Sequence, residues 1–226
     1  KYIRIQATDS SLWKYNRKTH TLIITGNGGT NSENAAIIDA DSQMDMDDGQ
    51  RYNIGSFSLD STAKGRHAAN ELITKTEKII IKDGITTINS AAFASFQSLT
   101  KITIPNSVKK IGDFALKDCK RLQQITIPAS VVKIGGGAFE NCTNLYDIKF
   151  ESGSNCNSME NYPNNPGSSP IQNCKNLRTF QMPNRIKYIS KYFFEGCDSL
   201  ESVSFGKNFR GYQMTFGDEN IFDDSS

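Results

Sequence analysis

Residues 99–121 are LTKITIPNSVKKIGDFALKDCKR, and residues 122–144 are LQQITIPASVVKIGGGAFENCTN. Both segments are 23 residues long, and they agree at Leu, Ile, Thr, Ile, Pro, Ser, Val, Lys, Ile, Gly, Ala and Cys. A period of this length is typical of a solenoid, in which each repeat forms one coil and neighbouring coils bury each other's apolar edges. These two segments therefore decide the fold, and the rest of the chain is placed by comparison with them.

Each repeat begins with a short strand in which apolar and polar residues alternate. In the first repeat, Leu99, Ile102 and Ile104 are expected to point into the core. Lys101 and Thr103 should point to solvent, because successive side chains of a strand lie on opposite faces. The proline that follows cannot donate to a strand ladder and ends the strand. The rest of the coil is expected to bend at Gly112 and to close with Val108, Ile111, Ala115, Leu116 and Cys119.

The pattern extends in both directions along the chain. It predicts six rungs, which start near Thr76 and at Leu99, Leu122, Leu145, Leu177 and Leu200. About three or more stacked coils are needed for a stable core, so six are sufficient. The inward residues predicted for the outer rungs are Ile79, Ile81, Ile85, Ile88, Ala92, Phe93, Phe96, Ile148, Phe150, Ile171, Cys174, Phe180, Met182, Ile186, Ile189, Phe193, Phe194, Cys197, Val203, Phe205, Phe209, Tyr212, Ile221 and Phe222.

The repeat resembles that of the BspA-like leucine-rich repeat family of bacterial and protist surface proteins. The run I-P-x-S-V-x-x-I-G-x-x-A-(F/L)-x-x-C-x-x-L extends from Ile104 to Leu122 and recurs from Ile127 to Leu145. The resemblance covers about residues 76–226, because the period, the Pro, the Gly and the Cys keep fixed offsets. It implies a mostly β, α/β-type repeat solenoid, a right-handed leucine-rich-repeat coil of about six 23-residue rungs.

We divide the chain at residue 75, with an N-terminal β-hairpin or capping module and polar loops at 1–75 and the solenoid at 76–226. The segments LWKY at 12–15 and TLIITGNG at 21–28 predict a hairpin, and they resemble one that often precedes the repeats in this family. A short helix is expected within residues 60–75, capped by Asp60 or Ser61. Trp13 either packs on the open end of the first coil or offers a stacking platform for a sugar.

Residues 27–58 are polar and lack a hydrophobic period, which predicts loops. Five acidic residues in this part, within Asp39–Asp48, raise the question of a calcium site. An EF-hand loop requires oxygen ligands at its first positions, whereas counting back from Gly49 places Met44 and Met46 there. The interpretations left open are a solvated loop and a calcium site of another kind.

The fourth rung, from Leu145 to Leu177, is longer than the others. Its excess lies within Glu151–Pro170, which is rich in Asn, Ser, Pro and Gly. Insertions in a solenoid emerge as loops, often on a binding surface. The alternative is a tolerated insertion without a role, since a longer loop costs little additional entropy.

Four of the five cysteines occupy one repeat position and are predicted to form a buried ladder of small apolar residues. Zinc ligands converge on a point, whereas a ladder spreads its members along an axis, so no metal site is expected from them. Cys156 lies outside the ladder in the polar insertion, where we expect an exposed thiol. The four ladder residues are Cys119, Cys142, Cys174 and Cys197.

Composition and motifs exclude several classes of function. A formal net charge of +2 gives no electrostatic argument for nucleic acid, and no apolar run is long enough to span a membrane. Lys1 is not a Met and no signal-peptide segment follows it, so we expect a mature form or a part of a longer chain. No G-x-S-x-G, H-E-x-x-H or P-loop motif is present, and we predict neither enzyme activity nor a cofactor.

The outward strand positions form a grid of mostly hydroxyl and amide side chains. Such a face offers hydrogen-bonding groups with little side-chain entropy to lose, which suits an extended protein or a glycan. Alternatively, Thr and Ser are simply good strand residues that keep the sheet hydrated. The binding residues predicted on the concave face are Lys101, Thr103, Gln124, Thr126, Asp147, Lys149, Thr179, Gln181, Ser202 and Ser204.

The family resemblance implies a secreted or cell-surface protein that takes part in adhesion to host matrix proteins or to other cells. We therefore predict a monomeric recognition module that binds an extracellular protein or glycan through its repeat surface. A passive structural spacer within a larger surface protein is the alternative, because a fold does not by itself determine a function.

Overall fold

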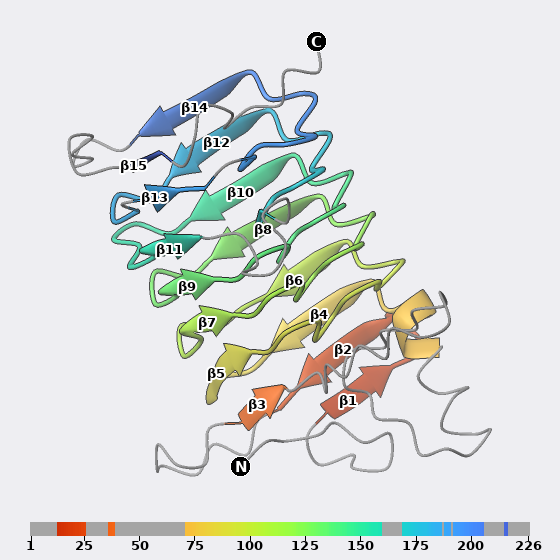
Figure 1. Ribbon diagram of the computed structural model, residues 1–226. Helices are drawn as coiled ribbons and strands as arrows, with labels where there is room; N and C mark the ends of the chain where they lie inside the picture. The colour runs from red at the N-terminus through yellow and green to blue at the C-terminus, as the bar shows by residue number, and fades with distance from the viewer. Residues whose placement is uncertain are drawn as a thin grey trace, which may run out of the picture.

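The protein, studied as a computed structural model, is described over residues 13–25, 36–38, 71–159, 169–186, 188–190, 192–205 and 215–216. Within these ranges it is a mostly-β solenoid whose coils stack along one axis, with two series of strands and one series of turns (Figure 1). The prediction of a mostly-β repeat solenoid is thus confirmed. The right-handed sense of the coil and the monomeric state stay predictions.

The first strand of each coil contributes to a face that we call the front face. The front strands are β2 (Thr21–Ile24), β4 (Lys78–Ile81), β6 (Lys101–Thr103), β8 (Gln124–Ile127), β10 (Asp147–Phe150), β12 (Thr179–Met182) and β14 (Ser202–Phe205). The pairs β2–β4, β4–β6, β8–β10 and β12–β14 are parallel and in register, so that Ile79 lies beside Ile102 and Ile125 beside Ile148.

The second strand of each coil lies on another face of the solenoid, which we call the side face (Figure 1). Here too the pairs are parallel, and Ile88, Ile111 and Ile134 lie beside one another on three successive strands. The side strands are β3 (Ala36–Ile38), β5 (Ile85–Ile88), β7 (Lys110–Ile111), β9 (Lys133–Ile134), β11 (Ser158–Met159), β13 (Tyr188–Ile189) and β15 (Thr215–Phe216).

Stacked turns close the coils opposite the strands, and their backbones also form a ladder. The N–H of Phe93 donates to the carbonyl of Ala115 at 2.8 Å, and the N–H of Leu116 donates to the carbonyl of Ala138 at 2.8 Å. In several coils, two residues four positions apart have a positive φ, which provides the sharp corners of the turn. These pairs are Ala91 and Ser95, Phe114 and Asp118, Gly137 and Asn141, and Tyr192 and Gly196.

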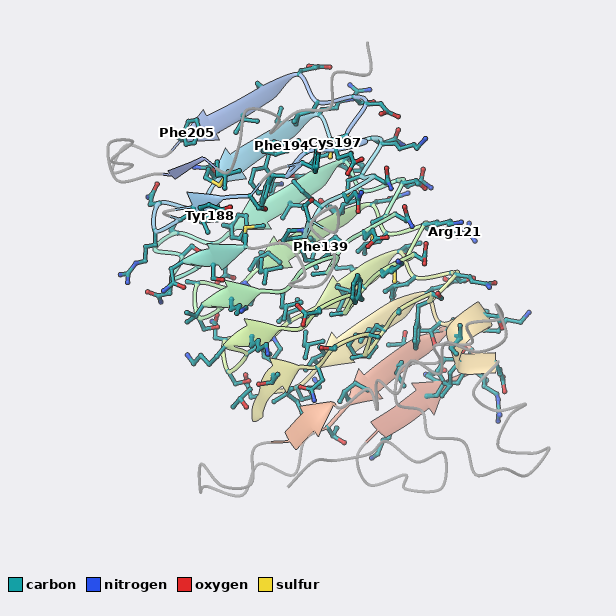
Figure 2. All side chains as sticks on the ribbon, in the orientation of Figure 1. Arg121, Phe139, Tyr188, Phe194, Cys197 and Phe205 are labelled. Carbon is teal, nitrogen blue, oxygen red and sulfur yellow. The ribbon has the colours of Figure 1, made fainter. Side chains whose placement is uncertain are left out.

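The inward residues of the repeat form one continuous core. Those predicted within 79–148 and 171–197 are buried, whereas the predicted inward residues Phe150 and Val203 are half-buried. Phe139, Phe194 and Cys197 lie between the strand series, whereas Arg121 points outward (Figure 2). Phe205 was predicted in the core but is 45% exposed. Its strand pairs with β12 on one side, and within the described residues no other front strand covers it.

The facing of the front strands leads to a stability prediction. Ile125→Ala should lower the free energy of unfolding by about 2–5 kcal/mol, because the fully buried side chain leaves a cavity. Thr126→Ala, on the exposed face of the same strand, should change it by no more than about 0.5 kcal/mol. Chemical denaturation of the two variants beside the unaltered chain measures both values. Similar losses in the two variants would contradict the assigned facing.

The N-terminal hairpin is present and is joined to the solenoid. β1 (Trp13–Asn16) pairs with β2 in antiparallel orientation, as predicted. β2 then pairs with β4 and β3 with β5, so that both faces continue across residue 75. The predicted helix is seen at residues 71–75. The division into two domains remains a proposal.

Several predictions fall outside the described residues. These are the capping of the helix by Asp60 or Ser61, the calcium question at Asp39–Asp48, and the inward positions Phe209, Tyr212, Ile221 and Phe222. The backbone of Trp13 belongs to β1, but the position of its side chain is likewise outside the description.

The fourth coil receives its additional residues in two places. Ile148 lies 23 residues after its partner Ile125, but Met159 lies 25 residues after its partner Ile134. Asn173 occupies the same place in its turn as Asn141, which lies 32 residues earlier, and its Nδ2 donates to Asn141 Oδ1 at 3.0 Å. Extra residues are therefore inserted both before and after β11, and the strand between them keeps its place in the side face.

Candidate binding surface

The ten residues predicted to bind all lie on the outer side of the front strands. Nine are exposed and Asp147 is half-buried. Equivalent repeat positions group them into two rows, and within the pair β8–β10 Gln124 lies beside Asp147 and Thr126 beside Lys149. Their participation in binding stays a prediction. One row contains Lys101, Gln124, Asp147, Thr179 and Ser202, and the other contains Thr103, Thr126, Lys149, Gln181 and Ser204.

Charges are few on this surface, and two of them neutralise each other. Lys149 Nζ lies 3.1 Å from Asp147 Oδ2, two residues away on the same side of β10. An exposed ion pair of this kind contributes no more than about 1 kcal/mol to stability. At the N-terminal end of the front face, Lys78 lies directly beside Lys101 in the register of β4 and β6. Hydroxyl and amide groups therefore dominate the face from β8 to β14.

Tyr146 is a large exposed residue immediately before β10 that the sequence pattern did not single out. Its side chain is 45% exposed, and its N–H donates to the carbonyl of Gln123 at 3.0 Å. The corresponding positions of the other repeats hold Thr100, Gln123 and Arg178. An aromatic residue at an otherwise polar repeat position is the signal that could have identified it, since exposed Tyr is frequent in recognition surfaces.

The four cysteines at the repeat position form the predicted buried ladder. Each thiol donates to a carbonyl of the preceding coil, as Cys119 Sγ does to Phe93 O at 3.1 Å and Cys142 Sγ to Leu116 O at 3.2 Å. Burial raises the pKa of Cys119 to about 12 and places the pKa of Cys142 well above its usual range. These residues hold neighbouring coils together and offer no reactive thiolate.

Cys156 is buried, with 0% exposure, so the prediction of an exposed thiol was wrong. The segment around it follows the turn of the preceding coil, because Asn155 N–H donates to Ala129 O and Asn157 N–H donates to Val132 O, both at 3.0 Å. Cys156 thus takes the inward place of Val131, 25 residues earlier. Burial raises the pKa of Cys156 to about 12.

Thiol reactivity tests this assignment. Because all five cysteines are buried, free thiols, the native protein should react with Ellman's reagent at pH 8 at most slowly. The unfolded chain in guanidinium chloride should release the colour expected for five thiols. One fast-reacting thiol in the native protein would contradict the burial of Cys156.

The remaining part of the described chain shows no alternative site of metal chemistry. Within the described ranges, no group of three His, Cys, Asp or Glu side chains is placed to share a metal ion. A helix that is apolar and long enough to cross a membrane is not found in those same ranges.

Comparison with known proteins identifies the repeat. The family model described as BspA type leucine rich repeat region matches residues 70–163 and 154–223, with six copies. None of the curated proteins matches the chain. Among solved structures, a leucine-rich repeat protein from Bacteroides ovatus is similar at 24% identity and a TM-score of 0.51, over 66% of this chain and 34% of that one.

Two further solved structures are similar to this chain. The leucine-rich repeat protein TpLRR of T. pallidum has 19% identity and a TM-score of 0.48, over 92% of this chain and 90% of that one. The pneumococcal vaccine antigen PcpA has 20% identity and a TM-score of 0.47, over 58% and 31%. The chain thus spans about a third of the length of the Bacteroides ovatus and pneumococcal proteins. Since the family model covers most of the chain, the protein belongs to the BspA-type leucine-rich repeat family.

Proposed function

We propose that this protein is a recognition module, secreted or at a cell surface, which binds an extracellular protein or glycan through its front face. The observation that carries the proposal is the arrangement of ten polar side chains on the outer side of the front strands, among which the pairs β8–β10 and β12–β14 are parallel and in register. The proposed location, secreted or at a cell surface, rests on the family of the repeat. This repeat resembles that of bacterial and protist surface proteins. We expect no enzymatic activity and no cofactor.

The physical argument concerns entropy and hydrogen bonding. Thr and Ser side chains on a sheet lose few rotamers when a partner binds, and Thr, Ser and Gln each offer at least one hydrogen-bond donor and one acceptor. The strands themselves are held by inward residues that are almost completely buried. A rigid face of this kind suits an extended partner such as a host matrix protein or a glycan chain.

Substitution of the front face tests the proposal. The purified chain would be applied to an array of matrix proteins and glycans, beside a variant with Thr103→Ala, Gln124→Ala, Thr126→Ala and Lys149→Ala. We expect the unaltered chain to bind at least one array member and the variant to lose at least about tenfold in affinity, or about 1.4 kcal/mol. Circular dichroism should show an unchanged fold, because all four residues are exposed.

A matched variant on the side face provides the control. It replaces Thr86, Thr87, Lys133 and Asn157 with Ala, and so removes the same kinds of side chain, two threonines, one lysine and one amide. Binding should persist in this control. If the front-face variant binds as well as the unaltered chain, the front face is not the site. If the chain binds nothing on the array, the spacer alternative is favoured.

A further inference from the structure

The solenoid is interrupted at the junction of the fourth and fifth coils, which we call the seam. Among the described strands, β10 and β12 belong to different sheets, and so do β11 and β13. Front strands β6 and β8 also belong to different sheets, but their side strands β7 and β9 remain paired. The turns remain joined there, since Asn173 N–H donates to Glu195 O at 2.8 Å and Cys197 Sγ donates to Ile171 O at 3.3 Å. The two coils are therefore bonded along the turns but not through either series of strands.

An insertion follows β10 at the seam. In the third coil, Pro128 follows the front strand directly, whereas in the fourth coil Glu151 takes that place and a longer segment follows. Glu151 Oε2 accepts the N–H of Ala129 at 3.1 Å, so its carboxylate is engaged by the third coil. The segment 151–154 is thereby held toward the third coil, and the space beside the fifth coil stays open.

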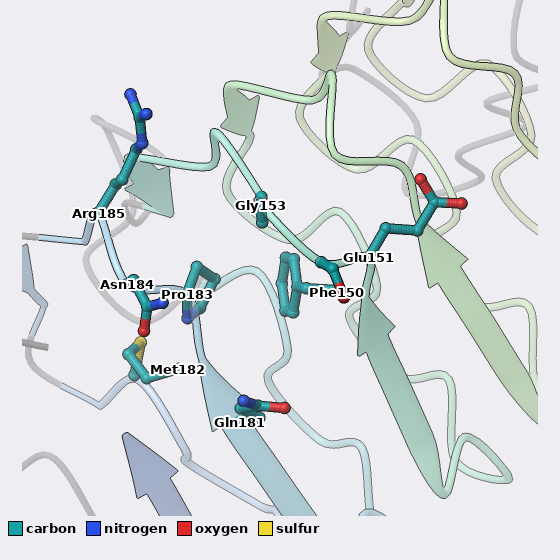
Figure 3. A pocket seen from close by; sticks show the side chains of 10 residues that line it. Phe150, Glu151, Gly153, Gln181, Met182, Pro183, Asn184 and Arg185 are labelled. Atoms are coloured by element: carbon teal, nitrogen blue, oxygen red, sulfur yellow. The ribbon is translucent and has the colours of Figure 1, made fainter. Parts of the chain in front are cut away.

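A pocket of about 470 Å³ occupies this space. It is lined by Phe150 and the segment Glu151–Ser154 from the fourth coil and by Gln181–Arg185 from the fifth. Figure 3 shows the rings of Phe150 and Pro183 on opposite sides of the opening, with the amide of Gln181 below them. Arg185 points away from the opening, and so does the carboxylate of Glu151 (Figure 3).

The lining combines an aromatic ring and the ring of Pro183 with uncharged amide groups, since its two charged side chains point away (Figure 3). The half-buried ring of Phe150 is fixed edge-to-face against the buried ring of Phe180, with 6.1 Å between the centroids. Gln181 and Asn184 are exposed and offer amide donors and acceptors. A pyranose ring presents an apolar C–H face and several hydroxyl groups, which match an aromatic ring and neighbouring amides. The volume is within the range of pockets for small ligands.

We propose that the pocket at the seam binds a neutral pyranose residue of a glycan, with Phe150 against its apolar face and with Gln181 and Asn184 hydrogen-bonded to its hydroxyls. The inference rests on the proposed recognition function and specifies the ligand class at one end of the front face. A proline-rich peptide would require a groove lined by several aromatic residues, whereas Phe150 is the single aromatic residue of this lining. An acidic sugar is disfavoured because both charged groups point away (Figure 3).

Saturation-transfer NMR with small probes tests the ligand class. The probes are the methyl glycosides of mannose, galactose and N-acetylglucosamine, the charged methyl glucuronide, and a hexaproline peptide. We expect transfer to at least one neutral glycoside. The double variant Gln181→Ala and Asn184→Ala should weaken its binding about tenfold, as for the loss of one or two hydrogen bonds.

The matched control is the double variant Gln123→Ala and Asn106→Ala. Asn106 follows Pro105 as Asn184 follows Pro183, and both control residues are exposed and lie outside the pocket. Its affinity for the neutral glycoside should stay within about twofold of the unaltered chain. All four residues are exposed, so both double variants should keep the fold.

The outcomes separate this inference from the proposed function. Equal binding of the neutral glycoside in both double variants would overturn the pocket assignment and leave glycan recognition intact. Binding of glucuronide or hexaproline alone would overturn the ligand class. Binding of no probe would overturn the inference, while the array experiment with the front-face variant decides independently whether the protein is a recognition module.

Discussion

Phe180→Ala should lower the free energy of unfolding by about 3–5 kcal/mol, the range for removal of a buried phenyl ring. Phe180 is 1% exposed. Its ring meets those of Phe150, Phe193 and Phe194 edge-to-face, at centroid distances of 6.1, 6.1 and 5.7 Å. This cluster joins the fourth and fifth coils where the strands are not hydrogen-bonded to each other. Its loss therefore affects the seam more than it would affect a continuous ladder.

Urea denaturation followed by circular dichroism measures the change, with Tyr188→Ala as the control. Tyr188 is an aromatic residue on the neighbouring side strand and is 42% exposed, so its removal should cost about 0.5 kcal/mol or less. A loss in Phe180→Ala no larger than that of the control would show that the aromatic cluster does not hold the seam.

Gly135→Ala should lower the free energy of unfolding by about 3 kcal/mol, the upper end of the range for overpacking. A Cβ at this position would lie 2.5 Å from the backbone N of Asp113 and 2.8 Å from its Cα, in the preceding coil. Gly112 stands in the same relation to Ser90, whose backbone N would lie 2.5 Å from the added Cβ. Backbone atoms cannot move aside, so the coils would have to separate.

Gly153→Ala is the matched control for this substitution. Gly153 has a φ of 76°, but an added Cβ would meet nothing within 4 Å. Its replacement should cost about 1–2 kcal/mol from backbone strain alone. Thermal or chemical denaturation of both variants separates the two contributions. If Gly135→Ala is no more destabilising than Gly153→Ala, close approach of the coils is not the reason for glycine at this repeat position.

The repeat period and the alternation in L-x-x-I-x-I predicted most of the core, although Phe205 is exposed and Cys156 is buried. Ile125 and Ile148 are buried side by side, and Thr126 and Lys149 are exposed side by side, because the facing of a strand depends on residues that are neighbours in the chain. The buried cysteine ladder followed from the same period. The alternation of apolar and polar residues also predicted that the ten candidate binding residues lie on one face, but it could not identify a ligand.

The burial of Cys156 could not be predicted from the repeat pattern. Its neighbours are polar, and composition alone predicted an exposed loop. Its burial depends on hydrogen bonds from Asn155 and Asn157 to the coil before it. Those bonds place this segment beside residues about 25 positions earlier, as Met159 lies beside Ile134. The sequence of the fourth rung contains no pattern that predicts this offset.

The amino-acid sequence by itself determined the coil, its period and the facing of its strands, because these depend on interactions within one repeat that recurs in every rung. Only the tertiary structure decided the spacing at Gly135, the burial of Cys156, the seam between β10 and β12 and the pocket beside Phe150. Each of these depends on how two neighbouring coils lie against each other, and the hydrogen bonds between coils join residues at least 22 positions apart in the chain.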